Sequence, residues 1–190
     1  CIGLHEHVDR ILHGTRCRRS YIPPLRNCPL MMSFVQSLDM SVLQSLYAMR
    51  DAQLVHIFIG ISELGSALTI YGLALCVGLL LILYRRYAAA AGLICAVATS
   101  GLAVVLGKGL IERARPPVSF RAYTEIWYSF PSAHAALSAA LYGYVLFLVW
   151  MFVPSPWIRI IATFLLPALV VAISFSRIYL GVHYLSDIIA

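Results

Sequence analysis

The sequence predicts an all-α protein, a bundle of helices that crosses a membrane several times. Three observations support this class: 61% of the 190 residues are hydrophobic, only 12% are charged, and several apolar runs are long enough to span a bilayer. Soluble domains carry about 25% charged residues, so this chain has too few polar groups to cover a water-facing surface. Lipid must therefore be the solvent for most of the chain, and in lipid the backbone polar groups are satisfied within helices.

The first 53 residues differ from the rest. Residues 1–30 are charged and rich in proline, with no sustained apolar pattern and no signal-peptide core. We expect a disordered leader or sequence upstream of the native start. Residues 31–53 mix Asp39 and Arg50 with apolar positions, which favours an amphipathic helix at the membrane interface.

Residues 54–190 are predicted to form a transmembrane domain. A hydrocarbon core about 30 Å thick needs roughly 20 apolar helical residues. Four runs meet this need: Leu64–Tyr84, Ala88–Gly107, Ala133–Val153 and Trp157–Ser176. The apolar pattern restarts after Asp187 and the sequence ends at Ala190, so we expect a further span that is cut off.

The arginines predict an orientation. Arg85, Arg86 and Arg159 fall at one end of the predicted bundle, which the positive-inside tendency assigns to the cytoplasm. The polar segments 108–131 and 177–184, together with the residues that follow, then meet on the opposite face.

Basic residues are scattered among apolar runs, which argues against a nucleic-acid-binding protein. The five cysteines have neither disulfide-framework nor metal-ligand spacing.

The shared outer face collects groups suited to an anion. Several fixed cations and free backbone amides are what a phosphate dianion requires, and the fork of arginine suits paired oxygens. Pro131 and Ser132 begin a helix, where unpaired N–H groups point outward and form an anion site. The candidate residues are Lys108, Arg115, Arg121, Ser132, His134, Arg177, His183 and Asp187.

His183 and Asp187 are four residues apart, so on a helix they would share a face. The carboxylate could then accept one imidazole N–H and leave the other nitrogen free as a nucleophile or base. Two alternatives stay open: a zinc site made by two histidines and the aspartate, and an acyl-transfer triad with Ser132. The surrounding cations disfavour the metal, and the triad leaves those cations without a purpose.

Three motifs in order resemble the signature of the type 2 phosphatidic acid phosphatase superfamily. They are Lys108-x6-Arg115-Pro116, Pro131-Ser132-Ala133-His134, and Ser176-Arg177-x5-His183-x3-Asp187. The family includes lipid phosphate phosphatases, glucose-6-phosphatase and vanadium haloperoxidases. The resemblance implies a metal-independent phosphatase without a cofactor, in a helical bundle whose membrane members usually have six spans. By that measure the first span is also expected to be absent here.

The resemblance also implies roles. His183 would attack phosphorus and form a phosphohistidine, oriented by Asp187, and His134 would serve as acid and then as base. The phosphoryl oxygens would be held by the side chains of Lys108, Arg115, Ser132 and Arg177 and by the Ala133 amide. The family usually has glycine at position 133, and alanine is tolerated if it begins the helix with a negative φ.

The expected substrate is a lipid phosphate or an isoprenyl pyrophosphate, such as phosphatidic acid or undecaprenyl pyrophosphate. The expected location is a bacterial inner membrane with the active site on its outer face. A phosphatase of a soluble phosphate monoester is the nearest alternative, and a transporter or inactive scaffold is the alternative from another class. Transporters tend to have repeats and mid-membrane charges, which this sequence lacks.

Arg121 is a candidate head-group contact, whereas four other charged residues are expected to be solvated: Glu63, Glu112, Arg113 and Glu125.

Overall fold

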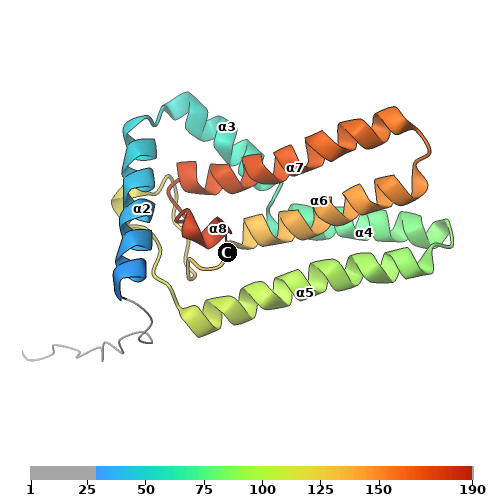
Figure 1. Ribbon diagram of the computed structural model, residues 1–190, viewed down its shortest axis with the longest axis horizontal. Coiled ribbons are helices and arrows are strands. Elements are labelled where there is room, and N and C mark those ends of the chain that lie inside the picture. Colours follow the sequence, from blue (N-terminus) through green and yellow to red (C-terminus); the bar gives the residue numbers. More distant parts are fainter. Residues whose placement is uncertain (1–28, 190) are drawn as a thin grey trace, which may run out of the picture. The chain divides into compact units, whose positions relative to one another are not determined.

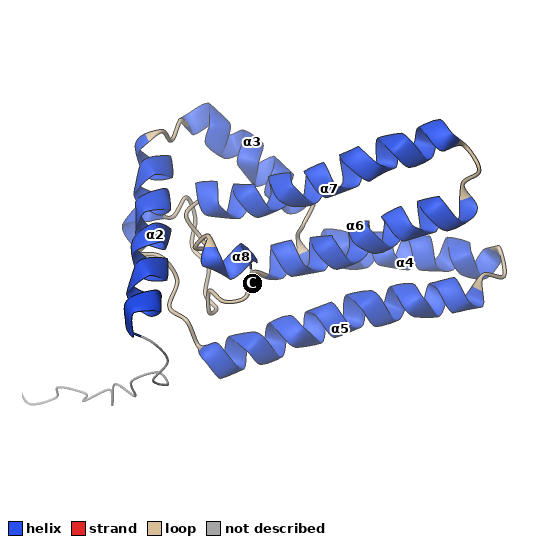
Figure 2. Ribbon diagram, in the orientation of Figure 1, coloured by secondary structure: helices blue, strands red, loops and turns tan. Residues whose placement is uncertain are grey.

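The computed structural model describes residues 29–189, and within that range all regular structure is helical, as predicted (Figure 2). The expected leader, residues 1–30, lies almost entirely outside the described residues. The elements are α2 (Pro29–Ala48), α3 (Ala52–Glu63), α4 (Ala67–Leu83), α5 (Tyr87–Ile111), the short 3-10 helix η1 (Val118–Phe120), α6 (Ala133–Phe152), α7 (Pro156–Tyr179) and α8 (Ser186–Ile189).

Four stretches of the described residues are long and apolar enough to cross a membrane: Ala52–Leu83, Tyr87–Ile111, Ala133–Phe152 and Pro156–Tyr179. The first differs from the prediction, because the helical run begins at Ala52 and is divided into α3 and α4. Asp51 begins α3 by accepting a hydrogen bond from Gln53 N at 2.6 Å, and Ser66 accepts one from Thr69 N at 3.3 Å at the start of α4. Two caps in one apolar run therefore make two helices.

Helices α4 to α7 pack as a bundle, with α4 beside α5, α5 beside α6, and α6 beside α7, while α3 packs against α7 (Figure 1). The hydrophobic core between the helices is a cluster of seven buried side chains: Ile70, Leu93, Val97, Leu137, Leu141, Tyr142 and Ile173. Large apolar side chains also cover the outside. Leu68 is 87% exposed, Leu110 83% and Phe164 74%. Such a surface fits only a hydrocarbon environment, so the chain is an integral membrane protein.

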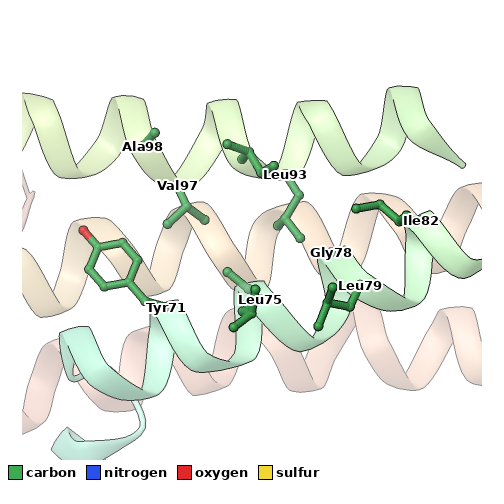
Figure 3. A pocket seen from close by; sticks show the side chains of 10 residues that line it. Tyr71, Leu75, Gly78, Leu79, Ile82, Leu93, Val97 and Ala98 are labelled. Atoms are coloured by element: carbon green, nitrogen blue, oxygen red, sulfur yellow. The ribbon is translucent and has the colours of Figure 1, made fainter.

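An apolar groove of about 230 Å³ lies between α4 and α5 (Figure 3). Its walls include Leu75, Leu79 and Leu93, and Tyr71 lies at one end. The residues that line it carry no charge. The groove therefore belongs to the lipid-facing surface, and chemistry must be sought where charged groups gather.

The two ends of the bundle differ in character. The α4–α5 connection, which carries Arg85 and Arg86, lies at the same end as the α6–α7 connection, and Arg159 stands in the first turn of α7 (Figure 1). The α5–α6 loop, residues 112–132, and the α7–α8 loop, residues 180–185, lie at the other end. Their backbones are joined where Ala122 N donates to Leu180 O at 2.9 Å. The predicted meeting of distant polar segments on one face is thus confirmed.

Helix α2 contributes more than an interfacial surface. Asp39, which interrupts the apolar pattern of the sequence, is only 1% exposed. Arg50, just beyond the end of the helix, donates to Phe120 O at 2.8 Å and to Tyr179 O at 2.6 Å. The segment is therefore attached to the polar end of the bundle through charged side chains.

Candidate active site

His183 lies in the loop between α7 and α8, three residues before α8 begins. The prediction that it shares a helix with Asp187 is therefore wrong, although the two side chains do meet. His183 Nδ1 lies 3.4 Å from Asp187 Oδ2, at ion-pair distance but without hydrogen-bond geometry. Only 1% of His183 is exposed. The loop brings the pair together because Gly181 turns the chain with a φ of +71°.

Gly181 is required at this position for two reasons. A positive φ is strained for a residue with a side chain. In addition, a Cβ here would lie 2.0 Å from Phe120 O, in the loop that faces it. The close approach of two backbones holds the histidine loop against the α5–α6 loop.

Asp187 is buried and fully engaged. Its Oδ2 accepts hydrogen bonds from Ser129 Oγ and from Tyr184 N, the latter at 2.9 Å, and its Oδ1 accepts one from Arg113 Nη1. Burial opposes ionisation, but the interaction with His183 and the bonds from Ser129 and Tyr184 N hold the pKa of Asp187 below its usual value. The carboxylate is therefore charged and fixed beside the ring.

Arg115 reaches the other side of the same ring. Its Nη1 lies 3.2 Å from His183 Nε2 and donates to Val182 O at 2.9 Å, while Nε donates to Trp127 O at 2.5 Å. Burial lowers the pKa of this guanidinium, and the Glu125 carboxylate opposes that shift. Arginine stays protonated in proteins, so a positive charge is held directly at the imidazole.

Glu125 joins Arg115 to Arg177. One carboxylate oxygen lies 3.1 Å from Arg115 Nη2, and the other lies 2.6 Å from Arg177 Nη2. Arg177, which is 1% exposed, also donates to Ser62 Oγ at 2.8 Å and to Tyr123 Oη. Burial raises the pKa of Glu125. The hydrogen bond and charge of Arg177, together with the charge of Arg115, outweigh burial and keep this pKa below its usual value. The prediction that Glu125 is solvated is wrong, because the two arginines draw it inward.

Lys108, Ser132 and Ala133 border the same region. Lys108 is 4% exposed in the last turn of α5 and donates to Tyr128 O at 2.5 Å. Ser132 precedes α6, and its hydroxyl is buried without a hydrogen-bond partner. Ala133 begins α6 and is not among the residues with positive φ. The expected helical conformation at position 133 is thus confirmed, and the first amides of α6 have no partner within the helix.

His134 stands in the first turn of α6 and interacts electrostatically with Arg177, Glu125 and His183. Arg121 donates from Nε to Pro116 O at 2.6 Å, so its hydrogen bond stabilises the loop. A cavity of about 350 Å³ lies beside the site and is bounded by Ser132, Asp187 and small residues of α5 and α6. The structure therefore brings every predicted catalytic residue and cation to one end of the bundle.

Sequence reasoning missed Arg113 and Asp39. Arg113 was expected to be solvated, but its Nη2 donates to Asp39 Oδ2 at 2.7 Å and its Nη1 donates to Asp187. The signal for Arg113 was its place two residues before Arg115, in the same charged segment. For Asp39 the sequence offers only an acid within an otherwise apolar helix, a pattern that an exposed residue gives equally well.

The protonation of His183 follows from its two neighbours. A guanidinium N–H can only donate, so Nε2 carries the free electron pair and the proton stands on Nδ1, toward Asp187. Burial lowers the pKa of His183 to about 4, although the Asp187 carboxylate pulls the other way. A neutral imidazole, charged partners on both sides and an anion pocket make a site suited to phosphoryl transfer.

The comparisons with known proteins show the family of the chain. The family model of the PAP2 superfamily matches residues 89–190, which is more than half of the chain. The chain belongs to the PAP2 superfamily. The resemblance noted from the three motifs is therefore confirmed, and all three lie within the matched region.

Relatives within the PAP2 superfamily include membrane phosphatases. The chain is 27% identical over 160 residues to phosphatidylglycerophosphatase B of Bacillus subtilis, covering 82% of this chain and 76% of the relative. The crystal structure of a transmembrane PAP2-type phosphatidylglycerolphosphate phosphatase from Bacillus subtilis matches with a TM-score of 0.76 and 26% identity, over 82% of this chain and 77% of that one. LpxE of Aquifex aeolicus, at 22% identity and a TM-score of 0.62 over 80% of this chain and 86% of that one, supports the fold alone.

Proposed function

We propose that this chain is a membrane phosphatase that hydrolyses a lipid phosphate or isoprenyl pyrophosphate through a phosphohistidine on His183. One observation carries the proposal: a neutral, buried imidazole presents Nε2 to Arg115 at 3.2 Å, within a region also bordered by Lys108 and Arg177. A phosphoryl group that displaced the resting contacts of these cations would lie directly in front of the nitrogen.

In the first step, the electron pair of His183 Nε2 forms a bond to phosphorus while the bond from phosphorus to the leaving oxygen breaks. The Nδ1 proton stays with the ring, and the charge that develops there is balanced by Asp187. His134 gives a proton to the leaving oxygen, so that an alcohol or a monophosphate departs. The role of Asp187 is supported by its burial and by its fixed position beside Nδ1.

Three cations would stabilise the charge on the phosphoryl oxygens during transfer. Lys108, Arg115 and Arg177 each approach from a different element, and each donates to protein oxygens in the absence of substrate. The unpartnered hydroxyl of Ser132 and the free amide of Ala133 supply neutral donors. These groups supply the positive charge and the donors that the phosphoryl oxygens need. Within residues 29–189, no three His, Cys, Asp or Glu side chains lie close enough together to bind a metal ion.

In the second step, His134 takes a proton from water, and the water oxygen attacks the phosphohistidine. The phosphorus–nitrogen bond breaks, inorganic phosphate leaves, and His183 returns to its neutral state. No cofactor enters either step. His134 therefore serves as the acid in the first step and as the base in the second.

The position of the site favours a lipid substrate. The cations stand where the spans end, so a phosphate could stay at the polar boundary while its hydrocarbon tail remained in the bilayer. The relative named above acts on phosphatidylglycerophosphate, which makes a phosphorylated glycerolipid the first candidate. Arg85, Arg86 and Arg159 lie at the opposite end, which supports an active site on the outer face of a bacterial inner membrane.

Phosphate release in detergent tests the proposal. Phosphatidic acid, undecaprenyl pyrophosphate and glucose 6-phosphate would be offered in parallel in the presence of EDTA, with His183→Ala as the control. We expect EDTA-resistant release from at least one lipid and none from the variant. Release from glucose 6-phosphate alone would replace the lipid substrate with a soluble one, and release that persisted in His183→Ala would refute the mechanism.

A further inference from the structure

Asp39 of α2 and Arg50, two residues beyond the end of α2, contact opposite ends of the loop that carries His183. Arg50 Nη2 donates to the carbonyl of Tyr179, the last residue of α7, at 2.6 Å. Asp39 accepts from Ser186 N at 3.0 Å and from Ser186 Oγ at 2.6 Å, at the first residue of α8. Residues 180–185 lie between these two anchors, so the segment fixes the loop on both sides.

Asp39 is buried and held by several hydrogen-bond donors. It is 1% exposed, and both carboxylate oxygens accept hydrogen bonds, including one from Arg113 Nη2 at 2.7 Å. Burying a carboxylate is costly unless donors and an opposite charge compensate it, and here both are present. Asp39 therefore belongs to the hydrogen-bond network that includes Arg113 and Ser186.

The chain of contacts leads from Asp39 to the nucleophile. Arg113 uses one nitrogen for Asp39 and the other for Asp187, and its Nη1 also donates to Ser186 Oγ at 2.7 Å. Asp187 Oδ1 is thereby held, so that Oδ2 is left to face His183 Nδ1 at 3.4 Å. A rotation of the Asp187 carboxyl would break its contact with Arg113.

We propose that Asp39 is a positioning residue for the histidine nucleophile. It fixes Arg113 and Ser186, and through them it keeps Asp187 beside Nδ1 and Nε2 directed at the phosphoryl group. The inference rests on the proposed function, because it assigns a part in phosphohistidine formation. Asp39 lies outside the region that the PAP2 family model matches, which begins at residue 89.

The prediction is specific to the first chemical step. Without Asp39, the guanidinium of Arg113 and the start of α8 lose a shared anchor, and a misplacement of about 1 Å at a nucleophile can slow its reaction roughly 100-fold. We expect Asp39→Asn to slow phosphohistidine formation about 10- to 100-fold with KM little changed. Hydrolysis of the phosphohistidine, which depends on His134, should proceed at the wild-type rate.

Rapid-quench measurements with ³²P-labelled phosphatidylglycerophosphate and phosphatidic acid test the inference, with Leu43→Ala as the matched control. Leu43 lies one turn from Asp39 on the same helix and is also 1% exposed, but it makes no polar contact with the site. Leu43→Ala should lower Tm by loosening α2 while leaving the rate of histidine labelling within about twofold of wild type.

If Asp39→Asn does not fold, Asp39→Asn/Arg113→Gln removes both charges of the Asp39–Arg113 pair, while Asp187 keeps its hydrogen bonds from Ser129 and Tyr184 N. The double variant should also label slowly. Wild-type labelling in either Asp39 variant would overturn the inference, as would equal slowing in Leu43→Ala at an equal loss of Tm. A wild-type protein that hydrolyses these lipids without labelling a histidine would instead overturn the proposed mechanism, and this inference with it.

Discussion

Arg115 Nη1 lies 3.2 Å from His183 Nε2, on the side of the ring opposite the nitrogen that faces Asp187. The two partners specify the same tautomer, because the guanidinium can only donate and the carboxylate can only accept. The ring is therefore neutral, with its free electron pair held toward the anion pocket. The proposed chemistry requires that state before substrate arrives.

The pH dependence of kcat/KM should reveal this state. Burial lowers the pKa of His183 to about 4, so the ring stays unprotonated, and able to attack, well below the ordinary histidine pKa of about 6.5. We expect the acid limb of kcat/KM, corrected for ionisation of the substrate, to appear only below about pH 4, where activity falls tenfold per unit. A one-proton loss of activity as the pH is lowered through about 6.5 would contradict the assignment.

Glu125 should compete with phosphate for the two arginines. Its carboxylate lies 3.1 Å from Arg115 and 2.6 Å from Arg177, so an incoming dianion must displace it. We expect Glu125→Gln to bind inorganic phosphate about fivefold more tightly, which corresponds to roughly 1 kcal/mol, as measured by product inhibition. Glu112→Gln, an exposed glutamate of the same loop, is the control. Equal inhibition constants in the two variants would show that Glu125 does not occupy the anion site.

Gly181→Ala should damage both stability and activity. The backbone φ of +71° is strained for alanine, and its Cβ would lie 2.0 Å from Phe120 O. The histidine loop must therefore move. We expect a lower Tm and a loss of at least about tenfold in kcat/KM. Gly109→Ala is the control: no side chain or neighbouring element lies within 4 Å of its added Cβ, and it replaces a helical glycine, which favours the helix by about 0.5–1 kcal/mol. Wild-type activity in Gly181→Ala would mean that the loop tolerates a different turn.

The sequence was sufficient to predict the helical bundle and the residues that meet at its polar end. Apolar runs of span length are a strong signal, because lipid demands them. The family motifs predicted that His134, His183 and Asp187 lie close together, and the structure brings them to one end of the bundle with His183 in a loop. The motif spacing reflects where side chains meet in space, and different local backbones can satisfy it.

The residues that were misassigned depend on tertiary contacts. Glu125 and Arg113 belong to a loop of irregular structure, where no periodicity separates an inward from an outward side chain. Asp39 is buried beside Arg113 and Ser186, which are 74 and 147 residues away in the sequence. The division between α3 and α4 was missed for a different reason. The run 52–83 is apolar as a whole, and the caps at Asp51 and Ser66 are local side-chain contacts.

The most direct test of the account is to trap the phosphorylated protein. In His134→Ala, p-nitrophenyl phosphate can still complete the first step, because nitrophenolate leaves without an acid, but the second step lacks its base. We predict a burst of about one nitrophenolate per protein molecule, with the phosphate found on His183 when peptides are mapped at alkaline pH. Phosphate on another residue, or steady turnover by the wild type with no covalent intermediate, would contradict the account.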